Sequence, residues 1–346
     1  MELAMIADIA EISQEAFDAL DKSAGAGACY QRLLQRQADM RWSVSYLRAI
    51  ENGCLTAAVP VYACRAKAWP HPAYDVRTWR LPDDVRDAAG PAGCLLVGGC
   101  SDGRSSLHVK RTDGQMHGLR TLIAEIARVA AERDRCLVFP YLDGATRMAL
   151  TEATQDAIAW SPLRTEALLL DVSDIGWESS IGSKARGVLR RDRRLIAAAD
   201  LSTAVRSWTE IEDEACELIA EHNVRKGERD HPEFARLRYR EWLECAGAEL
   251  IVFHATAADV TGVLTAIIWD EELELCEIGL TGRESPRRLA AYLKLVFHMP
   301  LELARTRGLV NIRVGFAAEA SKRARGAAME ELYGGVLDHV HTRGLR

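Results

Sequence analysis

The sequence predicts a mixed α/β fold made of two halves of similar construction. The chain has 346 residues, 48% hydrophobic and 27% charged, which is typical of a globular protein long enough to bury two cores. Each half runs in the same order, from a strand through helices and antiparallel strands to a further helix and strand. Because hairpins replace a strict strand–helix alternation, we expect mixed, mostly antiparallel sheets flanked by helices. The expected domains are residues 1–160 and 161–346.

A hairpin is the clearest element of the first half. Residues 43–50 and 54–64 are strand-like runs on either side of Glu51-Asn52-Gly53. Asn-Gly is a strong hairpin signal because both turn positions require positive φ. The other elements expected in this half are a strand over 1–12, a helix that buries Phe17 and Leu20, a Pro/Trp/Arg-rich loop over 69–93, a strand over 94–99, a helix over 118–133 and a strand over 136–141.

The second half repeats this order after a boundary near residues 157–164. A strand over 166–172 leads into a basic helix over 181–199 and then into an acidic helix over 210–225. The elements that follow are three strands over 249–256, 262–269 and 273–280, a helix over 287–305 that Pro300 should kink, and a strand over 309–316.

Composition and charge exclude several classes of protein. The formal net charge is −6, from 44 Lys+Arg against 50 Asp+Glu, which argues against broad nucleic-acid binding but allows a local basic site. The chain contains no apolar run of about 18 residues, so we expect no membrane span. The first residues are acidic and lack a basic leader, so we expect no secretory signal and a cytoplasmic protein.

Metal and common catalytic motifs are missing from the sequence. The nine cysteines are scattered without a C-x-x-C pair, and the nine histidines form no H-E-x-x-H spacing. We therefore expect buried reduced thiols and no metal. Neither a G-x-S-x-G turn nor a G-x-x-x-x-G-K-[ST] loop occurs, which argues against those hydrolase and nucleotide-binding classes.

Several short motifs resemble the GNAT fold used twice in tandem. The segment GSKARGVLRRDRR (182–194) resembles the R-x-x-L-R-R helix of the BioF2-like and Fem-like acyltransferases. Residues 291–315, followed by SKRARG (321–326), resemble the long helix, strand and lysine-bearing turn of the same group. Residues 45–65 and GCLLVGGC (93–100) carry a weaker resemblance in the first half. We therefore expect two tandem GNAT-like domains of the Fem-like type.

This resemblance implies transfer of an acyl or aminoacyl group. Fem-like enzymes take the aminoacyl group from charged tRNA, and the closest functional group includes enzymes of antibiotic biosynthesis. GNAT enzymes that use acetyl-CoA carry a glycine-rich loop whose N–H groups hold the pyrophosphate. The equivalent loop in the second half, TGRESPRRLAAY, has one glycine, Gly282, and a proline at Pro286. The first-half stretch has Gly114 and Gly118 at an unsuitable spacing, so a donor other than CoA is favoured.

The helix expected over 181–199 combines an apolar stripe with a cationic face. Six apolar side chains fall on one arc at about 100° per residue: Ile181, Ala185, Val188, Leu189, Leu195 and Ile196. Six basic side chains fall outside it, against the single acid Asp192: Lys184, Arg186, Arg190, Arg191, Arg193 and Arg194. All of these except Arg193 are our candidates for binding tRNA phosphates. A solvated helix surface and a protein contact remain alternatives.

The turn at 321–326 supplies a second candidate site. The resemblance implies that its lysine lies in the acyl-transfer cleft, which points to Lys322, with Arg325 as a phosphate-binding companion. A fixed cation there would stabilise negative charge on the attacked carbonyl or on a nearby phosphate. An ordinary surface turn is the alternative.

Three further side chains are catalytic candidates. Glu277 lies on an expected strand, where one face can present it as a base or amine anchor. Tyr292 and His298 lie on the expected long helix, with His298 pointing away from the apolar stripe. A structural role is the alternative for each.

The leading hypothesis is an aminoacyl-tRNA-dependent transferase that acts on a small amine or hydroxylamine. Ester to amide is downhill, so we expect no cofactor and no metal, and catalysis through alignment and charge stabilisation. The expected partners are charged tRNA and the amine, with no membrane and no stable protein partner. The alternatives are a CoA-dependent N-acyltransferase and a non-catalytic GNAT-like binding domain.

Overall fold

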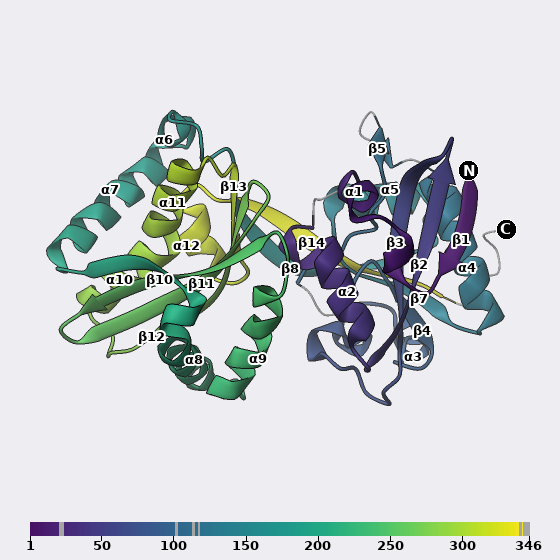
Figure 1. The fold of residues 1–346 in the computed structure, drawn as a ribbon, viewed down its shortest axis with the longest axis horizontal. Coiled ribbons are helices and arrows are strands. Elements are labelled where there is room, and N and C mark those ends of the chain that lie inside the picture. Colours follow the sequence, from purple (N-terminus) through teal and green to yellow (C-terminus); the bar gives the residue numbers. More distant parts are fainter. Residues whose placement is uncertain (21–23, 101–102, 113–114, 117, 339–340, 342–346) are drawn as a thin grey trace. The chain divides into compact units, whose positions relative to one another are not determined.

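The structure is a computed structural model that describes all residues except 21–23, 101–102, 113–114, 117, 339–340 and 342–346. It divides into two compact units (Figure 1). Unit 1 contains Met1–Arg164 together with Glu331–Arg346, and unit 2 contains Thr165–Glu330. Among the described residues, no helix is long and apolar enough to cross a membrane.

The strands of unit 1 follow the order β1-β2-β3-β4-β7-β14. The predicted hairpin is confirmed, since β2 pairs with β3 and both turn residues have positive φ, 51° at Asn52 and 78° at Gly53. Strands β4 and β7 pair in parallel, and β5 and β6 form a separate small ribbon. The bounds are β1 Glu2–Ile6, β2 Trp42–Glu51, β3 Cys54–Cys64, β4 Cys94–Val97, β5 Arg111–Thr112, β6 Gln115–Met116, β7 Cys136–Asp143 and β14 Ala328–Leu337.

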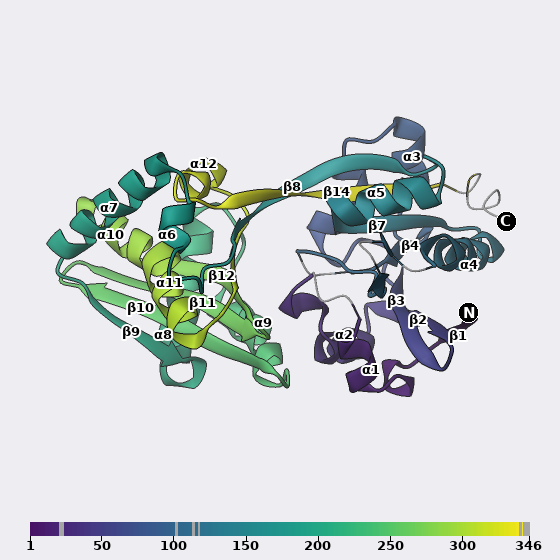
Figure 2. The same ribbon diagram turned by 90° about the horizontal axis from the view of Figure 1, so that it is seen from above.

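Helices cover both faces of the unit 1 sheet. The larger core lies under α4 and α5, which lie side by side (Figure 2). A smaller cluster on the other face contains Phe17 and Leu20, both buried as predicted, together with side chains of α2. The bounds are α1 Gln14–Asp18, α2 Tyr30–Ala38, α3 Asp83–Ala88, α4 Leu119–Glu132 and α5 Gly144–Ala153.

The strands of unit 2 follow the order β8-β13-β12-β11-β10-β9. The β12–β13 pair is parallel, and the other four pairs of described neighbouring strands in this unit are antiparallel, as expected for a mostly antiparallel sheet. The bounds are β8 Ala159–Leu169, β9 Ser202–Ser207, β10 Ala248–Ala257, β11 Val260–Trp269, β12 Glu272–Leu280 and β13 Asn311–Gly315.

The helices of unit 2 lie on opposite faces of this sheet (Figure 1). One group packs on the main core: α6 Trp177–Ser180, α7 Ser183–Ala198, α10 Pro286–Leu293 and α11 Met299–Arg307. The short helix α12, Glu319–Arg323, follows β13. The other group is α8 Trp208–Arg225 and α9 Pro232–Leu243. We did not predict α9, although Pro232 at its first turn is a common helix start.

The expected helix over 287–305 is interrupted. A π-helical turn, Lys294–His298, separates α10 from α11, and the Met299 N–H donates to the Lys294 carbonyl. Pro300 has no N–H to donate to Val296, so the chain widens one turn before the proline. The predicted disturbance at Pro300 therefore takes the form of a π turn.

The junction between the halves is a strand. Strand β8 runs through the expected boundary near 157–164, and β14 starts in unit 2 and ends in unit 1. From Glu331 onward the described chain packs with unit 1, although we expected it within the 161–346 domain. Glycine makes this packing possible, because a Cβ at Gly334 would lie 2.4 Å from the Trp79 ring.

Candidate functional site

Helix α7 presents a set of cations that have no partner in the described part of the chain. Ala185 and Leu189 are buried against the core, as the apolar arc predicted. Two of the six basic side chains are used internally: Arg186 donates to the carbonyls of Ser179 and Ile181, and Arg193 pairs with Glu178. The other four are exposed and make no hydrogen bond or ion pair with described residues: Lys184, Arg190, Arg191 and Arg194.

Asp192 of α7 is buried and forms an ion pair with Arg325. The Nε and Nη2 atoms of Arg325 donate to the two carboxylate oxygens over 2.7 Å and 3.1 Å. Nη1 of Arg325 donates to Ser321, and the guanidinium lies 4.7 Å from the centre of the Phe297 ring. These contacts occupy Arg325 within the fold, where we had expected a phosphate ligand. The pair connects the cationic helix to the turn that carries Lys322.

Lys322 is buried at the end of β13. Its side chain is 4% exposed, and Nζ donates to the carbonyls of Gly315 and Phe316 over 2.8 Å and 2.7 Å. From the last residue of β13 onward the chain has positive φ at three positions: Gly315 (79°), Ala317 (61°) and Ala318 (50°). Positive φ is unfavourable for alanine, so the Lys322 bonds help to hold this segment in place.

Burial changes the protonation of Lys322. Removal from water lowers the pKa of the Lys322 amine to about 8, and the charges of Glu166 and Glu319 oppose this shift. The amine is therefore still mainly protonated at neutral pH. Glu166 also accepts from Arg313 (3.2 Å), whose Nε donates to Glu272 (2.8 Å). This buried network joins β8, β13 and β12 near the Lys322 cation.

A β-bulge in β12 determines where Glu277 points. Two residues of β12, Cys276 and Glu277, oppose the single residue Thr265 of β11. Strict alternation from Leu275 would place Glu277 on the core face of the sheet. The extra residue moves Glu277 to the face under α8 and α9 and returns Ile278 to the core face.

Hydrogen bonds from α9 and β11 stabilise the bulge. Thr265 Oγ1 accepts the Glu277 N–H over 3.0 Å and donates to the Glu277 carbonyl over 3.1 Å. The hydroxyl proton of Thr265 is thus in use, so the buried Tyr239 hydroxyl donates to Thr265 over 2.6 Å. Burial raises the pKa of Tyr239 well above its usual value, which keeps this donor neutral.

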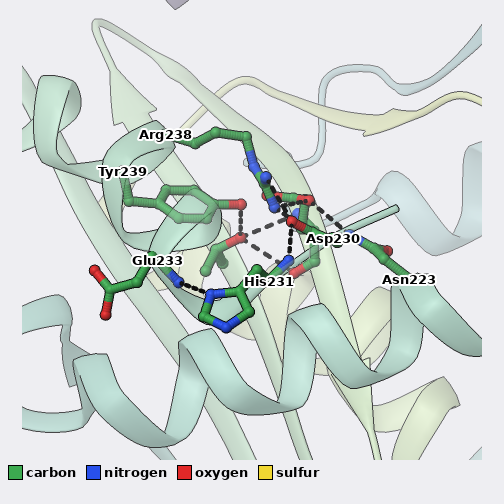
Figure 3. Close-up of polar contacts among 8 residues, drawn as sticks. Asn223, Asp230, His231, Glu233, Arg238 and Tyr239 are labelled. Atoms are coloured by element: carbon green, nitrogen blue, oxygen red, sulfur yellow. Dashed lines mark hydrogen bonds and ion pairs between the residues drawn. The ribbon is translucent and has the colours of Figure 1, made fainter. Parts of the chain in front are cut away.

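The Glu277 carboxylate belongs to a charged network (Figure 3). Arg238 of α9 donates to Glu277 through Nε (3.1 Å) and Nη2 (2.9 Å), and to Asp230 through Nη1 (3.0 Å) and Nη2 (2.7 Å). Asn223 of α8 donates to both carboxylates, over 2.8 Å to Asp230 and 3.1 Å to Glu277. The sequence identified Glu277, but it did not indicate Arg238, Asn223 or Asp230.

Tyr292 and His298 pack on the opposite face of the sheet from Glu277. Tyr292 packs against the main core, 6.5 Å from the Phe297 ring, and burial raises the pKa of its hydroxyl. His298 is 7% exposed within the π turn, and burial lowers the pKa of its ring although the charge of Asp192 opposes this. The four catalytic candidates therefore do not form one cluster.

The loop between β12 and α10 is closed by its own contacts. Ser285 caps α10 by accepting the Arg288 N–H over 3.1 Å, and Pro286 has no N–H to offer. Arg288 Nε donates to the Thr281 carbonyl over 3.2 Å, and Arg225 donates to the carbonyl before it. Pro286 and the bonded Arg288 N–H are therefore two positions at the start of α10 that offer no free N–H to a pyrophosphate.

The first-half glycines and the cysteines lie at scattered positions in the structure. In the first half, Gly114 lies outside the described residues, and Gly118 is the N-cap of α4 at φ 63°. Most cysteines are buried, while Cys54 and Cys276 are exposed. Within the described residues, no group of three or more His, Cys, Asp or Glu side chains is arranged to hold a metal ion.

Solved structures share the complete fold of this chain. FemX aligns with a TM-score of 0.63 over 98% of this chain and 97% of its own, at 10% identity. A tandem GNAT protein from the clavulanic acid biosynthesis pathway aligns with a TM-score of 0.51 over 96% and 98%, at 14% identity. The chain has a tandem GNAT fold of the Fem-like kind.

The shared tandem GNAT fold confirms the predicted fold class. A conserved protein of unknown function from Bacteroides thetaiotaomicron also shares it, with a TM-score of 0.57 over 97% of this chain and all of its own, at 12% identity. No protein-family model matches the sequence, and no curated protein matches it significantly.

Proposed function

We propose that the protein is an aminoacyltransferase that moves an amino acid from aminoacyl-tRNA to a small amine or hydroxylamine. The observation that carries this proposal is the set of four exposed, unpartnered cations on α7: Lys184, Arg190, Arg191 and Arg194. They lie within 11 residues of a chain whose net charge is −6. A concentrated cationic face on an acyltransferase fold fits a donor that carries a phosphate backbone.

The support beneath α7 makes this face suitable for docking. The buried Asp192–Arg325 pair anchors the helix, so its exposed cations project from a fixed surface. No aromatic side chain alternates with these cations in the helix sequence, so the face would contact phosphates rather than stack on bases. Contacts to phosphates do not depend on the attached amino acid, so they suit the acceptor arm of a charged tRNA.

The closed loop after β12 supports tRNA over CoA as donor. Ser285 and Pro286 remove N–H groups that a pyrophosphate would need at the start of α10. The side chain of Arg288 already bonds the loop carbonyl of Thr281. The kinship in fold with a tandem GNAT protein of the clavulanic acid pathway supports a place in natural-product biosynthesis.

The proposed chemistry is direct attack of the amine on the ester. A bond forms between the amine nitrogen and the ester carbonyl carbon, and the bond from that carbon to the terminal ribose oxygen breaks. Glu277 takes the amine proton and passes it to the leaving ribose oxygen, so that the products are an amide and free tRNA. The Lys322 cation holds the segment after β13 through its bonds to the carbonyls of Gly315 and Phe316. We assign Tyr292 and His298 to the core.

The salt dependence of tRNA binding tests the proposed interface. Arg190→Ala/Arg191→Ala should weaken binding about tenfold and lower the slope of log affinity against log salt by about two. A matched control is Arg120→Ala/Arg133→Ala at α4, which removes two exposed arginines that also lack a described partner. Equal effects of the two double variants would remove α7 from the proposal.

A further inference from the structure

Arg238 holds the Glu277 carboxylate and is itself bonded to a second carboxylate, that of Asp230. Arg238 contacts Glu277 through two N–H groups and Asp230 through two more (Figure 3). We propose that Asp230 and Arg238 form a positioning pair that orients the Glu277 carboxylate and balances the charge beside it. The inference rests on the proposed function, in which Glu277 takes the proton of the amine.

The hydrogen bonds leave Glu277 able to accept a proton. Its Oε1 atom accepts from Arg238 (2.9 Å) and Asn223 (3.1 Å), and its Oε2 atom accepts from Arg238 (3.1 Å). The Glu277 side chain is 28% exposed, so its carboxylate is accessible. Oε2 therefore keeps a lone pair for the incoming proton, while the bonds to Arg238 set its direction.

Asp230 is the fixed charge of the network. Its side chain is 6% exposed, and it accepts from Arg238, Asn223 and the His231 N–H. Burial acts to raise the pKa of Asp230, but these hydrogen bonds outweigh burial and lower it to about 2. Asp230 thus stays ionised at any pH at which the protein works. Two carboxylates and one guanidinium leave a net charge of −1.

The two partners act on Glu277 in opposite directions. Arg238 favours the ionised carboxylate, and Asp230 disfavours it by repulsion and by neutralising part of the Arg238 charge. Without Asp230, the guanidinium would make Glu277 a weaker proton acceptor. Without Arg238, Glu277 would keep its proton to higher pH and would lose its orientation. If the pair had only a structural role, removing Asp230 and removing Arg238 would not shift the pH dependence of transfer in opposite directions.

The other groups that face Glu277 do not reproduce this pattern. Helix α9 contributes Tyr239, whose raised pKa keeps it neutral. Helix α8 contributes the uncharged amide of Asn223, and β12 itself contributes Cys276, the neighbour in the bulge. Removing the charge of Asp230 or of Arg238 is therefore the most direct way to change the field at Glu277.

The test compares the pH dependence of single-turnover transfer from charged tRNA. In Arg238→Gln, the acid limb of the plot of transfer rate against pH should move up by about one pH unit. In Asp230→Asn it should move down, and in the double variant it should return close to the wild-type position. Arg238→Lys should restore the pH position but only part of the rate, because lysine lacks the planar fork. Arg236→Gln is the matched control on α9, since Arg236 pairs with Glu212, Asp213 and Glu233 instead.

A second measurement separates this inference from the proposed function. The ¹³C carboxyl signal of Glu277 in the free protein should titrate at higher pH in Arg238→Gln and at lower pH in Asp230→Asn. If the wild type transfers nothing but these shifts appear, the proposed function fails and the positioning pair stands. Shifts of the same sign, or no shifts, in variants that unfold at the wild-type temperature would overturn the inference.

Discussion

Asp192 of α7 and Arg325 at the end of the Lys322 turn form a buried two-point ion pair, with N–O distances of 2.7 Å and 3.1 Å. It joins two segments that are 133 residues apart in the sequence. The cationic helix and the segment that ends at Lys322 are thereby linked to one another. A disturbance of either partner should affect both.

We expect Asp192→Asn to destabilise the protein by about 3–5 kcal/mol, because it leaves the buried Arg325 charge without its counter-ion. Urea unfolding would measure this loss. Asp192→Leu/Arg325→Met removes both charges and should be less destabilising than Asp192→Asn. A loss below 1 kcal/mol in Asp192→Asn would mean that the pair is not a main anchor of α7.

The buried amine of Lys322 predicts a pH dependence of stability. Its folded pKa of about 8 is lower than the ordinary value of 10.5, so between these values the unfolded chain binds more protons than the folded one. The free energy of unfolding should therefore rise as pH increases from 8 to 10.5, by up to about 3 kcal/mol. Urea unfolding across this range should show a flatter dependence in Lys322→Met. If the free energy of unfolding depended on pH in the same way in the wild type and in Lys322→Met, the lowered pKa of Lys322 would be contradicted.

The hydroxyl of Thr265 should be essential for the bulge. Thr265→Val keeps the shape of the side chain but leaves the Glu277 N–H and the Tyr239 hydroxyl without their partner. We expect a loss of about 1–3 kcal/mol in stability and an altered environment of Glu277. Amide exchange at Glu277 would report the change directly. An exchange rate equal to that of the wild type would show that the bulge does not depend on this hydroxyl.

Two glycines of unit 2 should respond to alanine in opposite ways. A Cβ at Gly279 would lie 2.5 Å from backbone of α8 at Leu218, so Gly279→Ala must push that helix away from β12. Gly187 of α7 has open space, and Gly187→Ala should stabilise the helix by about 0.5–1 kcal/mol. The thermal unfolding temperatures of Gly279→Ala and Gly187→Ala, compared with that of the wild type, test both expectations. A stabilised Gly279→Ala would mean that α8 can move without loss.

Local patterns were sufficient to predict much of the fold. Asn52-Gly53 identified the hairpin because its signal lies within two residues. The apolar arc of α7 was confirmed because a helix repeats every 3.6 residues. The resemblance of short motifs indicated the tandem GNAT fold, which the shared architecture with FemX confirms.

The candidate site was harder to predict because it depends on contacts between distant segments. Strand periodicity cannot reveal the bulge that turns Glu277 toward Arg238, since one inserted residue changes the face. Asp192 was noted only as the single acid among the basic residues of the helix, because its partner, Arg325, lies far along the chain. The return of β14 to unit 1 is likewise a long-range pairing without a local signal.

The identity of the donor is the central claim of this account. The most direct measurement is a titration of the purified protein with bulk aminoacyl-tRNA, deacylated tRNA and acetyl-CoA under the same conditions. We predict the tightest binding for the charged tRNA, with an affinity that falls as salt is added. Binding of acetyl-CoA alone would contradict the proposal and indicate a CoA-dependent acyltransferase. Binding of none of the three would instead favour a non-catalytic GNAT-like domain.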